Sequence, residues 1–121
     1  MVVDRSAMLV ASLWAVWWRP VEGLTVAELE GSLDAHLAWM LSLEQAGHLF
    51  ASGPVTSGPG VLPGAGLTVL RAADATAAAT IAGRDPFVEK GLRTFEVFGW
   101  QLMEGAFTVR VSFGTGTYGF T

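Results

Sequence analysis

The sequence predicts an α+β domain in which an antiparallel sheet carries both helices on one face. Strand-like and helix-like segments follow one another along the chain in the order β-α-β-β-α-β, which is the order of a split βαβ unit. The 121 residues suffice for one hydrophobic core. With 51% hydrophobic and only 15% charged residues, the chain is expected to have more apolar surface than its own core can bury. An extra strand is predicted at the C-terminus.

The first predicted strand is the apolar run at residues 7–18. A membrane helix or the core of a signal peptide has a similar composition. This run is too short for a membrane helix, which needs about 20 residues, and Arg19 and Pro20 end it. No small-residue cleavage site follows. We therefore expect a buried strand, no membrane segment and a cytoplasmic location.

The clearest helix is predicted over residues 25–47. Thr25 and Glu28 have the spacing of a capping box, and Gly47 suits a left-handed helix end. Apolar side chains recur at helical spacing and are expected to face the core, with His36 among them or at their margin. They are Leu29, Leu33, Leu37 and Met40.

The remaining elements are short. An alanine-rich helix is predicted to begin after Asp74, and the stretch GRDPF separates it from one further helical turn. The predicted strands are residues 48–54, 67–72, 94–103 and 107–113, with a loop rich in glycine and proline between the first two.

The whole chain, residues 1–121, is predicted to be a single domain, with a core at about residues 9–103 and a C-terminal extension at 104–121. The tail GTGTYG matches the dinucleotide-binding pattern G-x-G-x-x-G. That pattern needs a following helix, and only Phe120 and Thr121 remain after it. We expect a frayed or partner-contacting tail instead.

Composition excludes several classes of function. The net charge is −4 and the seven basic residues are scattered, so no nucleic-acid partner is expected. The absence of cysteine excludes a disulfide framework, a thiolate nucleophile and thiolate-ligated zinc. The two histidines, His36 and His48, lack the spacing of metal ligands. We expect no metal and no cofactor.

Two residues are candidates for acid/base chemistry. His36 is either a satisfied core histidine or a proton-transfer group. Asp85 precedes Pro86, which is the pattern of a helix N-cap, and a carboxylate near a histidine can also hold the orientation of its ring. The residues alone leave both alternatives open.

Aromatic side chains and the predicted sheet point to contacts beyond a single chain. The five tryptophans are expected mostly in the core or an interface. For Trp39, three positions after His36, the alternative is that it lines a pocket. A sheet with both helices on one face leaves the other face uncovered. We expect a second copy of the chain to cover it.

The stretch HLAWMLSLEQAGHLFASGP, the later DPF and the strand containing Trp100 resemble the YciI-like (YCII-related) family over about residues 9–103. The resemblance implies a ferredoxin-like subunit that pairs through its sheet into a dimeric α/β barrel, as a homodimer or a larger homo-oligomer. It also implies that His36 and Asp85 are the active-site pair. The hydrophobic N-terminus and the C-terminal extension depart from a minimal member of the family.

Together with the residues, this resemblance predicts a cofactor-independent acid/base enzyme that carries out elimination, isomerisation or cyclisation on a small apolar or aromatic molecule. The residues expected to contact the substrate are Trp14, Trp39, Ser52, Gly53 and Phe87. One alternative is a non-catalytic module for ligand binding or assembly. A weaker alternative is a cofactor-free oxygenase of the dimeric barrel group.

Overall fold

The computed structural model describes residues 1–120, which form two compact units. The larger unit comprises residues 12–101, and the smaller combines residues 1–11 with the C-terminal residues from Leu102 onward. Within the described residues, no helix has both the length and the hydropathy to cross a membrane.

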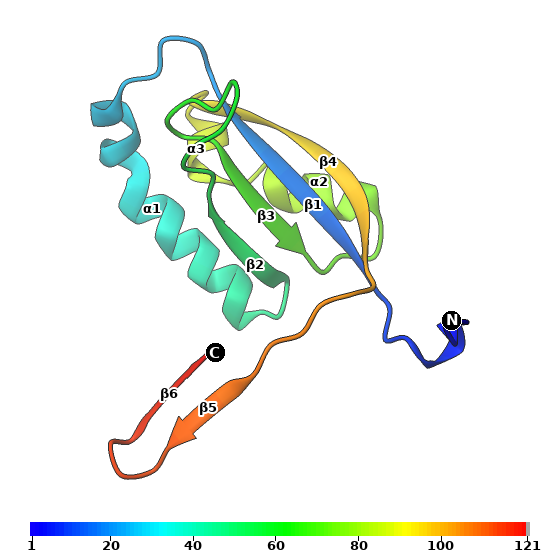
Figure 1. Ribbon diagram of the computed structural model, residues 1–121. Coiled ribbons are helices and arrows are strands. Elements are labelled where there is room, and N and C mark those ends of the chain that lie inside the picture. The colour runs from blue at the N-terminus through cyan, green and yellow to red at the C-terminus, as the bar shows by residue number, and fades with distance from the viewer. Residues whose placement is uncertain (121) are drawn as a thin grey trace. The chain divides into compact units, whose positions relative to one another are not determined.

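The larger unit has the predicted α+β order (Figure 1). A four-stranded sheet has the strand order β2-β3-β1-β4, and β3 pairs antiparallel with both β1 and β2. The non-sequential order confirms the split βαβ fold. Its elements are β1 (Ala11–Pro20), α1 (Val26–Gln45), β2 (Leu49–Pro54), β3 (Gly66–Leu70), α2 (Ala75–Ala82), α3 (Pro86–Glu89) and β4 (Arg93–Leu102).

The ends of α1 follow the predicted signals, whereas the first strand is displaced. The Thr25 hydroxyl accepts a hydrogen bond from the Glu28 backbone N–H at 3.2 Å, and Gly47 has a left-handed φ of +81°. The first strand runs from Ala11 to Pro20, whereas residues 7–18 were predicted. Arg19 lies within it, and its guanidinium pairs with Glu96 of β4 at 2.8 Å.

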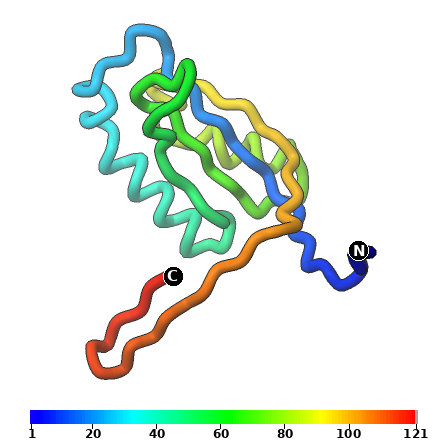
Figure 2. The backbone as a smooth tube through the Cα atoms, viewed as in Figure 1, coloured from blue at the N-terminus to red at the C-terminus, as the bar shows by residue number. Residues whose placement is uncertain are grey.

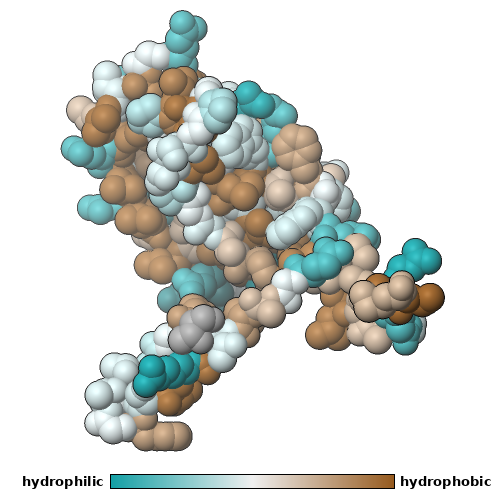
Figure 3. All heavy atoms as spheres, viewed as in Figure 1, coloured by the Kyte–Doolittle hydropathy of each residue, from teal (hydrophilic) through white to brown (hydrophobic). Residues whose placement is uncertain are grey.

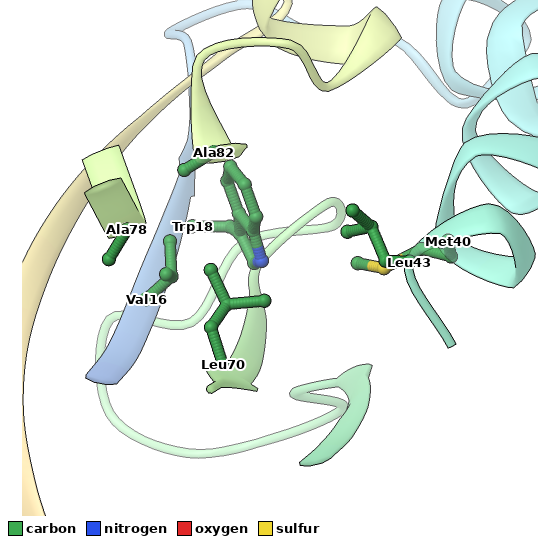
Figure 4. Packing of buried hydrophobic residues seen from close by; sticks show 7 residues of the cluster. All are labelled: Val16, Trp18, Met40, Leu43, Leu70, Ala78 and Ala82. Carbon is green, nitrogen blue, oxygen red and sulfur yellow. The ribbon is translucent and has the colours of Figure 1, made fainter. Parts of the chain in front are cut away.

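The core lies between the sheet and the helices (Figure 4). The Trp18 indole lies between the small side chains of α2 and the larger apolar side chains of α1. Alanines on α2 let that helix approach the sheet closely. The buried cluster is formed by Val16, Trp18, Met40, Leu43, Leu70, Ala78 and Ala82.

The predicted apolar stripe of α1 is divided between two surroundings. Met40 is buried in the core, but Leu33 and Leu37 are 41% and 48% exposed, so the prediction that they face the core is wrong. They line a cavity described below. The cavity therefore separates this part of the stripe from the core that Met40 joins.

The opposite face of the sheet has no helix over it within this unit. On β4, Phe95 and Val97 pack against the core, so the alternating side chains Phe98 and Trp100 point to the other face. These two side chains are 51% and 44% exposed. The sheet therefore presents aromatic side chains on its uncovered face.

In the smaller unit, the end of the chain forms a hairpin (Figure 2). Strands β5 (Val109–Ser112) and β6 (Thr117–Phe120) pair antiparallel, and a short 3₁₀ turn, η1 (Arg5–Ala7), lies near the N-terminus. We expected the glycine-rich tail to be frayed or to contact a partner. It is not frayed, because its backbone groups pair with those of β5, and contact with a partner stays a prediction. The predicted extra strand pairs with β6 and not with the main sheet.

Candidate active site

The beginning of α3 fixes the position of Asp85. Asp85 is the N-cap of this helix: its Oδ1 accepts a hydrogen bond from the Phe87 backbone N–H at 3.3 Å, and Pro86 occupies the first helical position. Its side chain has no exposed surface. The cap thus directs a carboxylate into the interior, where its remaining oxygen lone pairs need partners.

His36 on α1 is the first of these partners. Its Nδ1 lies 2.8 Å from Asp85 Oδ1, across 49 positions of sequence. The imidazole stacks on the Phe87 ring with centroids 4.5 Å apart and an interplanar angle of 21°. The side chain is 12% exposed, so one edge remains open. A ring held by a hydrogen bond and by stacking has a fixed direction.

Arg93 at the start of β4 is the second partner, and it was not among the site residues predicted from the sequence. Its Nε donates to Asp85 Oδ2 at 2.7 Å, and its guanidinium lies over the Trp18 ring at 4.0 Å. Arg93 Nη2 is buried without a hydrogen-bond partner among the described residues. A signal was present: Arg93 has the same parity as the core-facing Phe95 and Val97 in the strand, and a charge there needs a buried partner.

The surroundings keep Asp85 ionised. Burial by itself raises the pKa of the Asp85 carboxyl, but the His36 hydrogen bond and the Arg93 charge outweigh this and hold the pKa below its usual value. Burial lowers the pKa of the Arg93 guanidinium, and the Asp85 carboxylate opposes that effect. Arginine remains charged in proteins. A buried carboxylate and a buried guanidinium therefore neutralise each other beside His36.

A cavity of about 1290 Å³ opens between α1, β2 and the loop at residues 55–65. Four of the seven predicted site residues line it, and Arg93 lines it as well. The exposed leucines of α1 form an apolar wall, and Figure 3 shows hydrophobic side chains gathered over this side of the unit. The four predicted residues on the lining are His36, Ser52, Gly53 and Phe87.

The other predicted site residues lie elsewhere. Asp85 is buried and does not line the cavity, but it bonds two side chains that do, those of His36 and Arg93. Trp39 packs edge-on against Trp18, with centroids 6.5 Å apart, and belongs to the periphery of the core. Trp14 donates its indole N–H to the Ala72 carbonyl at 3.1 Å and also packs against the core.

A chain of hydroxyl groups reaches the cavity from the core. The Trp18 indole N–H donates to Thr68 Oγ1 at 2.7 Å, and Thr68 Oγ1 lies 2.7 Å from Ser52 Oγ. Thr68 is fully buried, and either of the two hydroxyl groups can be the donor of this hydrogen bond. With Thr68 as the donor, Ser52 keeps its own hydrogen for a group in the cavity.

Residues 1–120 contain no cluster of three or more histidine, aspartate or glutamate side chains that could hold a metal ion. The charged groups around His36 instead form a network of hydrogen bonds. A partly buried, oriented histidine beside an apolar cavity is an arrangement suited to proton transfer.

The sequence profile of the YCII-related domain matches residues 13–101 of this chain. The chain belongs to the YCII-related family. The match covers almost the whole larger unit, including α1, α3 and β4, which provide His36, Asp85 and Arg93. The smaller unit lies entirely outside it.

A solved structure also resembles this member of the YCII-related family. It is the 5-chloro-2-hydroxyhydroquinone dehydrochlorinase TftG of Burkholderia phenoliruptrix AC1100, in complex with 2,5-dihydroxybenzoquinone. The TM-score is 0.60 at 20% sequence identity, over 73% of this chain and 92% of that one. At this identity the likeness establishes the fold, which agrees with a ferredoxin-like dimeric α/β barrel subunit. Among curated proteins, none matches the sequence closely enough to count as a relative.

Proposed function

We propose that this protein is a cofactor-independent acid/base enzyme that acts on a small aromatic or largely apolar molecule. The observation that carries the proposal is the hydrogen bond between His36 Nδ1 and Asp85 Oδ1 at the edge of an apolar cavity. The similar fold of an enzyme that removes hydrogen chloride from a hydroxylated aromatic compound supports it. Elimination is the reaction class that we favour, with isomerisation and cyclisation as variants of the same proton transfers.

His36 would carry the proton. Because Asp85 is held as a carboxylate, the neutral ring carries its hydrogen on Nδ1 and leaves Nε2 as the basic nitrogen. In an elimination, Nε2 takes a proton from a substrate atom, and the electron pair of the broken bond expels the leaving group. Asp85 does not touch the substrate in this mechanism; it holds the ring and balances the imidazolium charge.

The cavity supports a substrate that is mostly apolar and carries an oxygen. Leu33, Leu37 and Phe87 offer hydrophobic contact. The Ser52 hydroxyl, oriented by Thr68, would donate a hydrogen bond to a phenolic or carbonyl oxygen. Glu30 and Glu44 also line the cavity, so a strongly anionic substrate is disfavoured.

A non-catalytic ligand-binding module remains the second candidate. The observation that favours it is the completeness of the Asp85 network, since hydrogen bonds from two side chains and one backbone N–H would also serve a purely structural role. Both candidates use the same cavity. They differ in whether a bound compound is converted.

The test compares the wild type with His36→Gln on a panel of hydroxylated and chlorinated aromatic compounds, including 5-chloro-2-hydroxyhydroquinone. Chloride release and proton exchange in D₂O are followed by ion chromatography and NMR. We expect conversion of at least one compound, reduced by a factor of about 10² to 10⁴ in the variant. Compounds that bind at the cavity without conversion by the wild type would support the module instead.

We also propose that two copies pair through the uncovered face of the sheet. Exposed aromatic side chains on that face, among them Phe98 and Trp100, support the pairing. A single antiparallel sheet with helices on one face commonly leaves its second face to solvent, but large aromatic residues are unusual there. This pairing is also compatible with a larger homo-oligomer that is built from such dimers.

A further inference from the structure

The buried guanidinium of Arg93 is not used by the proposed proton transfer. It is 6% exposed and reaches Asp85 through Nε–H, on the oxygen opposite to the one that faces His36. Its guanidinium also lies over two aromatic rings, at 4.0 Å from Trp18 and 4.9 Å from Phe87. Such packing fixes the plane of the cation and its distance from Asp85.

The two hydrogen bonds on Asp85 have opposite consequences for His36. A lone buried carboxylate would stabilise an imidazolium strongly and would hold the ring in its charged form, in which Nε2 cannot accept a proton. A carboxylate already paired with a guanidinium attracts a second cation less, because the charge of Arg93 also repels the imidazolium. The orientation of the ring survives, while much of the charge effect is cancelled.

Other charged groups are present on the elements that pack around His36. Lys90, after α3, donates to Ser32 on α1 at 2.9 Å, one helical turn before His36. Glu30 and Glu44 of α1 line the cavity. No hydrogen bond or ion pair joins these three side chains to the His36 ring among the described residues, whereas Asp85 bonds it and Arg93 bonds Asp85.

We propose that Arg93 is a positioning residue that shares the charge of Asp85 and so limits how strongly this carboxylate favours protonation of His36, while Asp85 still holds the ring with its hydrogen on Nδ1 and with Nε2 free. The inference rests on the proposed role of His36. Asp85 orients the ring through Oδ1, and Arg93 occupies Oδ2 and offsets part of the carboxylate charge.

The test is an NMR titration of the His36 ring nitrogens in the wild type, Arg93→Gln, Arg93→Lys and Arg71→Gln, with no substrate present. In Arg93→Gln the titration midpoint of His36 is expected to rise by about one pH unit. Arg93→Lys keeps the positive charge and should raise the His36 midpoint by less than half of the rise in Arg93→Gln. Arg71→Gln removes an exposed arginine that bonds the Leu49 carbonyl, and no shift is expected.

An unchanged or lowered midpoint in a folded Arg93→Gln protein would overturn the proposal, as would equal shifts in the Gln and Lys variants. Wild-type ring shifts that place the neutral proton on Nε2 would overturn it too. If Arg93→Gln does not fold, NMR of the wild type provides the test. The Arg93 Nε–H signal should be observable and should change its chemical shift as His36 titrates. A signal that exchanges rapidly with solvent, or does not respond to the titration, would refute the coupling of Arg93 to His36.

This test is separate from that of the proposed function. A raised midpoint in Arg93→Gln without conversion of any compound by the wild type would leave the role of Arg93 intact and reject the enzyme. Conversion of a compound by the wild type, together with an unchanged His36 titration midpoint in Arg93→Gln, would support the enzyme and reject the proposed role of Arg93. In an active enzyme, the acidic limb of the pH–rate curve should move upward in Arg93→Gln together with the NMR midpoint.

Discussion

At the scale of single residues, Asp85 joins two roles that its sequence context presents as alternatives. The residue caps α3 through the Phe87 N–H and contacts His36 with the same oxygen. The cap explains why an aspartate precedes Pro86, and the interior direction of the cap explains how the carboxylate reaches α1. Helix capping therefore delivers the charge to the candidate site.

The lowered pKa of Asp85 makes acid stability a test of this network. A carboxyl with a folded-state pKa below its unfolded value stabilises the fold above the unfolded value of about 3.9, and this stability is lost as the pH falls through the folded-state pKa. Asp85→Asn also leaves Arg93 buried without a counter-charge. We expect it to cost about 3–5 kcal/mol at pH 7 in urea unfolding.

The loss should shrink toward pH 3, because below about pH 3.9 the unfolded wild type takes up a proton that the folded carboxyl resists, and the wild type loses this part of its stability. Asp74→Asn is the matched control, since Asp74 caps α2 through the Ala77 N–H and asparagine is an equally good cap. It should change stability little at either pH. A constant difference between wild type and Asp85→Asn from pH 7 to pH 3 would contradict the assigned charge state.

At the scale of elements, the loop at residues 55–65 forms one wall of the cavity and is held by close packing at Gly64. Gly64 has φ +99°, and a Cβ there would lie 3.2 Å from Pro20 and Leu24 side-chain atoms and 3.4 Å from Leu29. The loop therefore packs against the end of β1 and the first turns of α1. A glycine is needed for both the backbone conformation and the close approach.

Gly64→Ala should destabilise the protein by about 2–4 kcal/mol, from left-handed strain together with crowding. Gly60→Ala is the control that measures the backbone strain without the crowding, because Gly60 has φ +72° and an added Cβ there would have no atom within 4 Å. That control should lose only about 1–2 kcal/mol. Urea unfolding of both variants measures the difference, and equal losses would show that the contacts to Pro20 and Leu24 are not tight.

At the scale of the whole molecule, the proposed pairing through the sheet predicts a defined oligomer. Phe98→Glu places a charge on the uncovered sheet face and should convert a dimer into monomers in sedimentation velocity, with the far-UV spectrum retained. Leu41→Glu changes an equally exposed side chain on α1 and should leave the dimer intact. A wild type that sediments as a monomer at tens of micromolar would contradict the pairing.

Much of the larger unit was predictable because its signals are local. The order of elements, the Thr25 cap, the Gly47 stop and the Asp85-Pro86 helix start depend on neighbours in sequence, and the structure shows all of them. The C-terminal hairpin was only half predicted. The pairing of β5 with β6 requires a turn within a tail whose glycines favour many conformations, so its composition is compatible with disorder as well.

The sequence by itself determined the α+β order, the capping of both main helices and the selection of His36 and Asp85 as candidates, since periodicity, caps and motif spacing act over a few residues. Only the tertiary structure decided that His36 and Asp85 form a hydrogen bond across 49 positions of sequence, and that Arg93 bonds the second oxygen of that carboxylate. It also decided that Leu33 and Leu37 line a cavity. Trp14 and Trp39 pack against the core instead. These contacts depend on how α1 packs against the sheet. This packing involves side chains that are distant in sequence, so no local pattern encodes it.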